Sequence, residues 1–129
     1  MKKLFILALL SFCLSTLPAV AGDHMKNIQF SHKQPSVSLQ GAAVRGDRDI
    51  YLLNAQKGHC LMVKFSSLEN NGALEVAAMA NGKPIGGTVE QSEGGFTWIS
   101  ELPVTGAYKI IVSPTRGNVN YNMEISVVE

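Results

Sequence analysis

One arginine near the end of the chain has the sequence setting of a recognition residue. Arg116 stands between Pro114 and Gly117, in a short segment that separates two apolar runs. A planar guanidinium on a rigid loop tip can grip a carboxylate through two parallel hydrogen bonds. The sequence therefore makes Arg116 a candidate partner-binding residue, and an ordinary solvated turn residue is the alternative.

A second polar turn, Gly46-Asp47-Arg48-Asp49, carries two carboxylates that flank an arginine. Acids at this spacing in a loop can contribute to a Ca²⁺ site, but Ca²⁺ takes about six to eight oxygen ligands and only two side chains are local here. A simple acidic turn is the alternative interpretation. Glu90 and Glu93 lie in another polar loop, where a catalytic carboxylate pair and ordinary loop acids are again the two interpretations.

The usual signatures of enzymes and metal centres are missing from the sequence. There is no Gly-x-Ser-x-Gly motif, no phosphate-binding glycine loop and no His-Glu-x-x-His motif. The histidines, His24, His32 and His59, have no cysteine or carboxylate partners at metal-ligand spacing, and Asp23-His24 alone closes no site. We therefore expect a protein that is not an enzyme and that binds no cofactor and no metal.

Residues 1–21 have the features of a secretory signal peptide. A basic head at residues 1–3 precedes a nearly continuous apolar run over Leu4–Leu17, and a small-x-small sequence ends at Ala21. The run is too short to span a bilayer comfortably, since a span needs about 20 apolar residues. We expect cleavage after Ala21, a periplasmic or secreted location, and no membrane insertion afterwards; a retained anchor is the alternative.

The remainder, Gly22–Glu129, is predicted to form one domain. The chain has 129 residues, with 11 Lys and Arg against 10 Asp and Glu, so no field of one sign favours nucleic acid or an anionic membrane. Loss of Cys13 with the signal peptide leaves Cys60 alone, which excludes an internal disulfide. Cys60 lies in an apolar run and is predicted to be a buried thiol, with an intermolecular disulfide or a reactive thiol as alternatives.

The predicted domain consists of strands and turns. Short runs rich in β-branched and aromatic residues end at Gly, Pro, Asn or Asp. The last run places Tyr121, Met123, Ile125 and Val127 on one face and polar residues on the other. About eight strands at roughly ten-residue spacing predict an all-β fold, an antiparallel, jelly-roll-like β-sandwich. The predicted core aromatic residues are Phe65, Trp98, Tyr108 and Tyr121.

Two local predictions follow from turn chemistry and from position in the chain. Asn81-Gly82 lies between apolar runs, which is a strong hairpin signal. The pattern predicts that Ala73–Ala80 pairs with Pro84–Val89. Residues Gly22–Lys26 are predicted to be a loose leader, as mature termini often are.

Most of the domain resembles a bacterial prepeptidase C-terminal-type β-sandwich. The resemblance is carried by Gly46–Tyr51, by Lys57-Gly58 before an apolar strand, by Leu102–Lys109 with its Leu-Pro-x-Thr-Gly-x-Tyr turn, and by Tyr121–Ile125. It implies a β-sandwich and a glycan- or protein-binding module of the cell envelope. An exposed Trp98 is the aromatic side chain that such glycan binding would use.

A narrower resemblance is to the periplasmic inhibitors of g-type (goose-type) lysozyme. Besides the two turns at Gly46–Tyr51 and Leu102–Lys109, it includes Lys26–Phe30 and Thr115-Arg116. In that family, a basic loop near the last hairpin and the turn that matches Gly46–Asp49 contact the lysozyme cleft. The resemblance implies that the partner is a g-type lysozyme, blocked without chemistry; a structural envelope protein is a further alternative.

The functional positions of the inhibitor family are only partly kept. Arg116 matches the first arginine of the family's loop, whereas the second basic position is Asn120 here. Asp47 stands where the family carries an aromatic residue. The partner-binding residues that the resemblance implies are Arg116, Thr115, Gly117, Asn118, Asp47 and Arg48.

Overall fold

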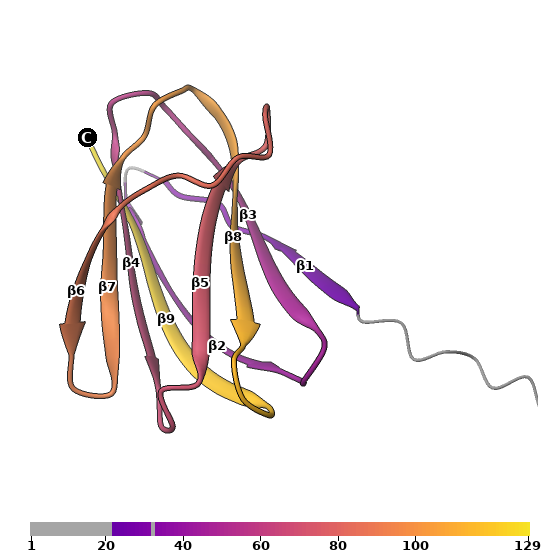
Figure 1. Ribbon diagram of the computed structural model, residues 1–129. Helices are drawn as coiled ribbons and strands as arrows, with labels where there is room; N and C mark the ends of the chain where they lie inside the picture. The colour runs from indigo at the N-terminus through magenta and orange to yellow at the C-terminus, as the bar shows by residue number, and fades with distance from the viewer. Residues whose placement is uncertain (1–21, 32) are drawn as a thin grey trace, which may run out of the picture.

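The chain forms a sandwich of two β-sheets (Figure 1). The structure is a computed structural model that describes residues 22–31 and 33–129. The predicted signal peptide and His32 lie outside the described residues. The described residues form nine strands: β1 Asp23–Asn27, β2 Ser36–Ala43, β3 Arg48–Ala55, β4 Cys60–Ser67, β5 Gly72–Ala78, β6 Thr88–Ser92, β7 Gly95–Glu101, β8 Gly106–Pro114 and β9 Val119–Val128. Among the described residues, no helix is long and apolar enough to cross a membrane.

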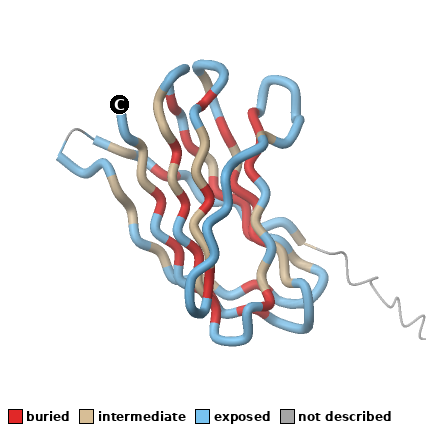
Figure 2. Tube along the Cα trace, turned by 60° about the vertical axis from the view of Figure 1, so that its left-hand side comes forward, coloured by how far each residue is buried: buried red, intermediate tan, exposed pale blue. Residues whose placement is uncertain are grey.

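The predicted all-β sandwich is confirmed. One sheet has the order β1-β3-β8-β5 and the other β2-β9-β4-β7-β6. In β9, buried Tyr121, Met123 and Ile125 alternate with exposed Asn120, Asn122 and Glu124, because successive side chains of a strand point to opposite faces. β4 shows the same alternation, with Leu61, Val63 and Phe65 buried, and Figure 2 shows buried and exposed residues following one another along the strands.

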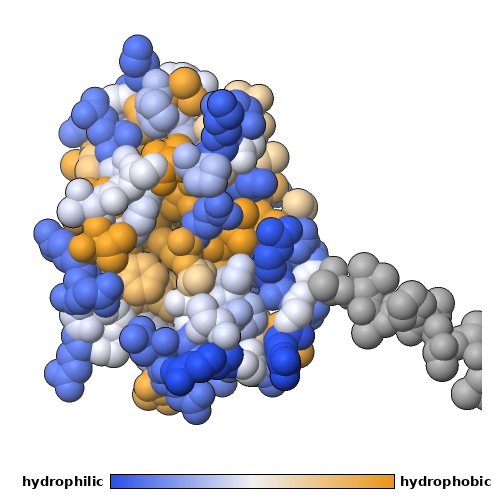
Figure 3. All heavy atoms as spheres, in the orientation of Figure 1, coloured by the Kyte–Doolittle hydropathy of each residue, from blue (hydrophilic) through white to orange (hydrophobic). Residues whose placement is uncertain are grey.

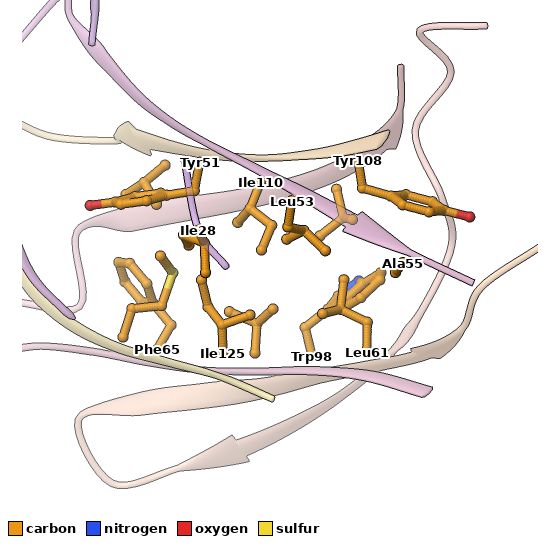
Figure 4. Close-up of a cluster of buried hydrophobic side chains, with 14 of the residues drawn as sticks. Ile28, Tyr51, Leu53, Ala55, Leu61, Phe65, Trp98, Tyr108, Ile110 and Ile125 are labelled. Carbon is orange, nitrogen blue, oxygen red and sulfur yellow. The ribbon is translucent and has the colours of Figure 1, made fainter. Parts of the chain in front are cut away.

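The core fills the space between the two sheets. Figure 4 shows Tyr51, Leu53, Tyr108 and Ile110 of one sheet facing Leu61, Phe65, Trp98 and Ile125 of the other. All four predicted core aromatic residues are buried, with Trp98 only 6% exposed. Sequence reasoning left out a fifth buried aromatic residue, Tyr51.

The predicted loose leader is wrong, because Asp23–Asn27 forms strand β1. It pairs in parallel with β3, from Asp23 opposite Arg48 to Asn27 opposite Leu52. All five residues of β1 are exposed. The strand therefore leaves no hydrophobic alternation in the sequence, which is the signal on which strand prediction depends.

The predicted hairpin around Asn81-Gly82 is limited to one bridge, and its two segments do not pair as strands. Strand β5 pairs with β8, and after the turn the chain crosses to the other sheet, where β6 pairs with β7. A single bridge between Ala77 and Pro84, with the Ile85 amide donating to the Val76 carbonyl at 2.7 Å, is what joins the two segments. Pro84 has no amide hydrogen with which to extend the ladder.

The prediction of a buried Cys60 is wrong as well. Leu61, Val63 and Phe65 of β4 point into the core, so Cys60 lies on the outer face of the five-stranded sheet. There it is half-buried, and it pairs with Glu101 of β7 and Val128 of β9. The thiol is therefore partly accessible from the surface.

Candidate functional site: the loops at one end of the sandwich

Four connections lie at the lower end of the molecule in Figure 1. They are β2–β3 (residues 44–47), β4–β5 (68–71), β6–β7 (93–94) and β8–β9 (115–118). The predicted site residues fall at the β2–β3 and β8–β9 connections. The pairing of Asp49 with Val112 sets the start of β3 beside the end of β8. Figure 3 shows this end as mostly hydrophilic. Hydrophobic residues gather higher up, at the middle of the face that is seen in that view.

Asn71 holds the β8–β9 loop in place. Its side chain is buried, and its Nδ2 donates to the carbonyl oxygens of Arg116 at 3.1 Å and Asn118 at 2.8 Å. The Thr115 amide donates in turn to the Asn71 carbonyl at 2.8 Å. Gly117 has a φ of 58°, in the left-handed region that favours glycine. The shape of the loop is therefore held by the Asn71 side chain together with backbone groups.

Asn118 ties this loop to the neighbouring β2–β3 connection. Its Oδ1 accepts a hydrogen bond from the Arg45 amide at 2.9 Å. Arg45 is exposed, and within residues 22–31 and 33–129 neither Arg45 nor Arg116 makes an ion pair. Two cationic side chains therefore sit on connections that are hydrogen-bonded to each other.

The Arg116 side chain is held as well. Its Nη2 donates to the Glu69 carbonyl oxygen at 2.9 Å, so the guanidinium lies over the β4–β5 connection. A guanidinium has five N–H donors. One is used here on a neutral acceptor, so the positive charge of Arg116 is positioned without being neutralised.

Asp47 and Arg48, by contrast, are hydrogen-bonded to residues 22–24, at and just before the start of β1. Asp47 accepts from the Gly22 backbone nitrogen at 2.9 Å and lies 3.4 Å from Nε2 of His24; the Gly22 bond, and then His24, lower the pKa of Asp47. Arg48 donates from Nε and Nη2 to the two oxygens of Asp23, at 2.9 and 2.8 Å. This hydrogen-bonded pair lowers the pKa of Asp23 and raises that of Arg48.

A buried hydrogen-bonded chain lies under this end of the sandwich. Tyr121 donates to Oδ2 of Asp49 at 2.5 Å, and the hydroxyls of Tyr51 and Tyr121 are 2.6 Å apart. Because the single Tyr121 proton goes to Asp49, Tyr51 donates to Tyr121. Burial raises the pKa values of both tyrosines. The chain joins β3 of one sheet to β9 of the other.

The two carboxylates of the Gly46–Asp49 turn do not converge on a shared cation site. Asp47 faces Gly22 and His24, whereas Asp49 points inward to Tyr121. Among the described residues, no group of three or more His, Cys, Asp and Glu side chains is placed to hold a metal ion.

Asn120, at the family's second basic position, lies beyond the loop on β9. It lines a hollow of about 510 Å³ on the outer face of the five-stranded sheet, together with Gln40, Ser66 and Asn122. These lining side chains carry amides and hydroxyls and no charge. Apart from Arg116, the arginine of this end that makes no ion pair with the described residues is therefore Arg45, which sequence reasoning missed.

Asn71 was also missed, although the sequence marks its position. Asn70-Asn71-Gly72 is recognisable as a turn. Nothing in it shows that the Asn71 amide reaches the carbonyls of residues 116 and 118, far along the chain. A search for asparagines that flank a predicted strand start would have selected Asn71 as one of several candidates.

The structure resembles solved structures of lysozyme inhibitors. PliG of Aeromonas hydrophila, a periplasmic inhibitor of g-type lysozyme, matches with a TM-score of 0.67 and 24% identity over 83% of this chain and 99% of that one. A mutant of the Escherichia coli PliG gives 0.61 and 24% over the same shares.

The likeness extends to a domain of a different protein. The prepeptidase C-terminal domain of Bacillus anthracis collagenase gives a TM-score of 0.58 and 13% identity over 83% of this chain and 95% of that one. No family model and no curated protein sequence matches the chain. The chain thus has the fold of the PliG-type lysozyme inhibitors, which is also that of a prepeptidase C-terminal domain.

Proposed function

We propose that this protein is a periplasmic or secreted inhibitor of g-type lysozyme, released by cleavage of residues 1–21, and that it acts without catalysing a reaction. The observation that carries the proposal is the pair of exposed arginines, Arg45 and Arg116, on loops that hydrogen bonds hold at one end of a PliG-type sandwich. The partner is a protein.

The proposed mechanism is blockade of a cleft lined by carboxylates. Glycoside hydrolysis by a lysozyme requires one of these carboxylates to act as a general acid. A guanidinium paired with it favours the ionised form, which cannot donate a proton. Arg116 makes this contact, and the sandwich behind it keeps substrate out of the cleft.

The other residues of this end have supporting roles. Thr115, Gly117 and Asn118 give the loop its shape, through the backbone hydrogen bonds and the positive φ described above. Arg45 supplies the second cation next to the loop. Asp47 and Arg48 are secondary contacts, because each already has intramolecular partners.

Burial of Trp98 supports the inhibitor over the glycan-binding alternative. Glycan binding by an aromatic platform needs a large ring at the surface, and Trp98 is only 6% exposed. The face that carries Gln40, Asn120 and Asn122 offers amides without a large exposed aromatic ring among its lining residues.

The proposal is tested by a lysis assay with the purified mature protein. Residues 22–129 are titrated against g-type, chicken-type and invertebrate-type lysozymes on permeabilised cells. We expect stoichiometric loss of g-type activity alone. Undiminished lysis by g-type lysozyme at a large molar excess of the protein would refute the proposed function.

Arg116→Ala tests the mechanism. Removing one partner of a buried charge pair costs about 2–5 kcal/mol of binding, which raises the inhibition constant about 30-fold to several thousandfold. Arg45→Ala, at the edge of the contact, should have a smaller effect that shrinks with added salt. Lys57→Ala, in the β3–β4 loop at the opposite end, is the matched control and should inhibit like the parent.

A further inference from the structure

The first three residues after the proposed cleavage site are Gly22-Asp23-His24. In the full chain, the Gly22 nitrogen is a peptide amide; cleavage after Ala21 turns it into a free α-amine. The mature chain then begins with an amine, two successive backbone amides and a histidine side chain. Four nitrogens so linked can surround one metal ion in a plane, the geometry that Cu(II) and Ni(II) prefer.

We propose that the mature amino terminus is a Cu(II)- and Ni(II)-binding site. Its ligands are the α-amine of Gly22, the amide nitrogens of Asp23 and His24, and Nδ1 of His24. On binding, the ammonium and both amides release their protons to solvent and the imidazole binds in its neutral form. The inference rests on the proposed cleavage after Ala21 and is independent of lysozyme inhibition.

The structure already brings the two outer ligands together. The Gly22 nitrogen and the His24 ring meet the two oxygens of one carboxylate, that of Asp47, at 2.9 and 3.4 Å. The His24 ring also lies against Gly22, because a methyl group on Gly22 would be 3.8 Å from Nε2. The amine and the imidazole thus lie on the same side of the chain.

The imidazole is free to present the correct nitrogen. Nε2 is the nitrogen that faces Asp47, and Nδ1 makes no hydrogen bond with any of the described residues. The His24 side chain is 63% exposed. A metal-bound histidine commonly donates its second ring nitrogen to a carboxylate, and Asp47 is in place to accept from Nε2.

Metal binding competes with the pairing of β1. The metal takes the Asp23 and His24 amide nitrogens, so the chain must release the start of β1 from β3, including the 3.0 Å bond from the Arg48 amide to the Gly22 carbonyl. These bonds lie at the exposed end of an edge strand, where local opening costs little. Occupation of the site therefore loosens the contact of Arg48 with Asp23, whereas Asp47 keeps its place beside Nε2 of His24.

The test uses the chain expressed with its own first 21 residues and purified after secretion. Mass spectrometry identifies the first residue, and the protein is titrated with Cu(II) and, separately, with Ni(II). We expect a start at Gly22, one ion bound per chain, the violet absorption band of a planar Cu(II)–nitrogen complex, and a yellow, diamagnetic Ni(II) complex.

Three variants separate this site from adventitious binding. His24→Ala, and an otherwise identical chain with one extra residue before Gly22, should both lose the band, because each breaks the spacing of amine and histidine. His59→Ala should keep it. A start other than Gly22, no band in the parent, a band that survives either of the first two changes, or its loss in His59→Ala would each overturn the proposal, whatever the result of the lysozyme assay.

Discussion

Replacing Asn71 by alanine should destabilise the protein and weaken the proposed inhibition, because the buried Asn71 side chain holds the loop that carries Arg116. The side chain is 3% exposed and donates to two loop carbonyls, those of Arg116 and Asn118. Each bond contributes about 1 kcal/mol net, and the two partly buried carbonyls left without donors add to the loss. We expect Asn71→Ala to lower the free energy of unfolding by about 2–3 kcal/mol.

Two measurements test this prediction. Thermal unfolding should show a midpoint about 10 to 20 °C lower, since 1 kcal/mol shifts a domain of this size by about 4–8 °C. Amide hydrogen exchange below the unfolding transition should show faster exchange of the Thr115 amide, which donates to the Asn71 carbonyl. In the lysis assay the inhibition constant should rise, because Arg116 no longer stands on a fixed loop.

Asn122→Ala is the matched control for this substitution. It removes the same side chain from β9, where Asn122 is exposed, and should change the free energy of unfolding by less than about 0.5 kcal/mol. If Asn71→Ala unfolds at the parent's midpoint and leaves exchange at Thr115 unchanged, the inference that Asn71 holds the β8–β9 loop is refuted.

Three further predictions concern the buried tyrosine pair. Tyr121→Phe deprives buried Asp49 of its hydrogen-bond donor and should lower the free energy of unfolding by about 1–3 kcal/mol, measured by urea titration. Gly41→Ala should cost about 1–3 kcal/mol in the same assay, because the new methyl carbon would lie 2.3 Å from the Tyr121 ring. The raised pKa values of Tyr51 and Tyr121 mean that the folded state binds their protons more tightly than the unfolded state. This contribution to stability is complete below a pH of about 10, where unfolded tyrosine ionises, and is lost as the pH rises further. Ultraviolet titration should show that both tyrosines ionise only when the protein unfolds. Ionisation of either tyrosine in the intact fold would contradict this prediction.

The sequence predicted those strands whose two faces differ. β9 has an apolar residue at every second position and was placed correctly, and the four aromatic residues predicted for the core are buried. β1 has no such pattern, because all five of its side chains are exposed and it is held by backbone pairing with β3 and by charged groups. Its assignment as a loose leader failed for that reason.

Predictions of pairing partners succeeded less well than predictions of strands. An Asn-Gly turn fixes the local path of the chain, and the hairpin prediction assumed that the strands beside it must also pair. In the structure β5 finds its partner in β8, about thirty residues on, and Pro84 stops the local ladder. Whether β5 pairs with β8 or with the segment after the turn depends on which side chains are buried between the sheets. The residues of the turn do not determine this.

In the candidate site, the loop of Arg116 was recognisable from the sequence, but the groups that hold this loop were not. A backbone carbonyl is available at every residue, so no pattern marks the carbonyls of residues 116 and 118 as the acceptors of Asn71. Arg45 was missed for a related reason. Arg45 is joined to the loop by a hydrogen bond from its backbone amide to Asn118. Any residue except proline could make that bond, so the arginine side chain does not mark the position.

The way in which this end is held together decides which of its arginines can serve a partner. The hydrogen bonds that hold the two loops use neutral groups: the Asn71 amide, the Asn118 side chain and the Glu69 carbonyl. They fix the backbone at Arg45 and the guanidinium of Arg116 while leaving both charges uncompensated within the described chain. Arg48 is equally well placed by sequence, but its guanidinium is bound by both oxygens of Asp23. A partner's carboxylate would have to displace Asp23 to reach Arg48, whereas at Arg116 it need only join a neutral contact. Arg116 should therefore contribute most of the binding energy. Arg48 should contribute only when the start of β1 is released from β3.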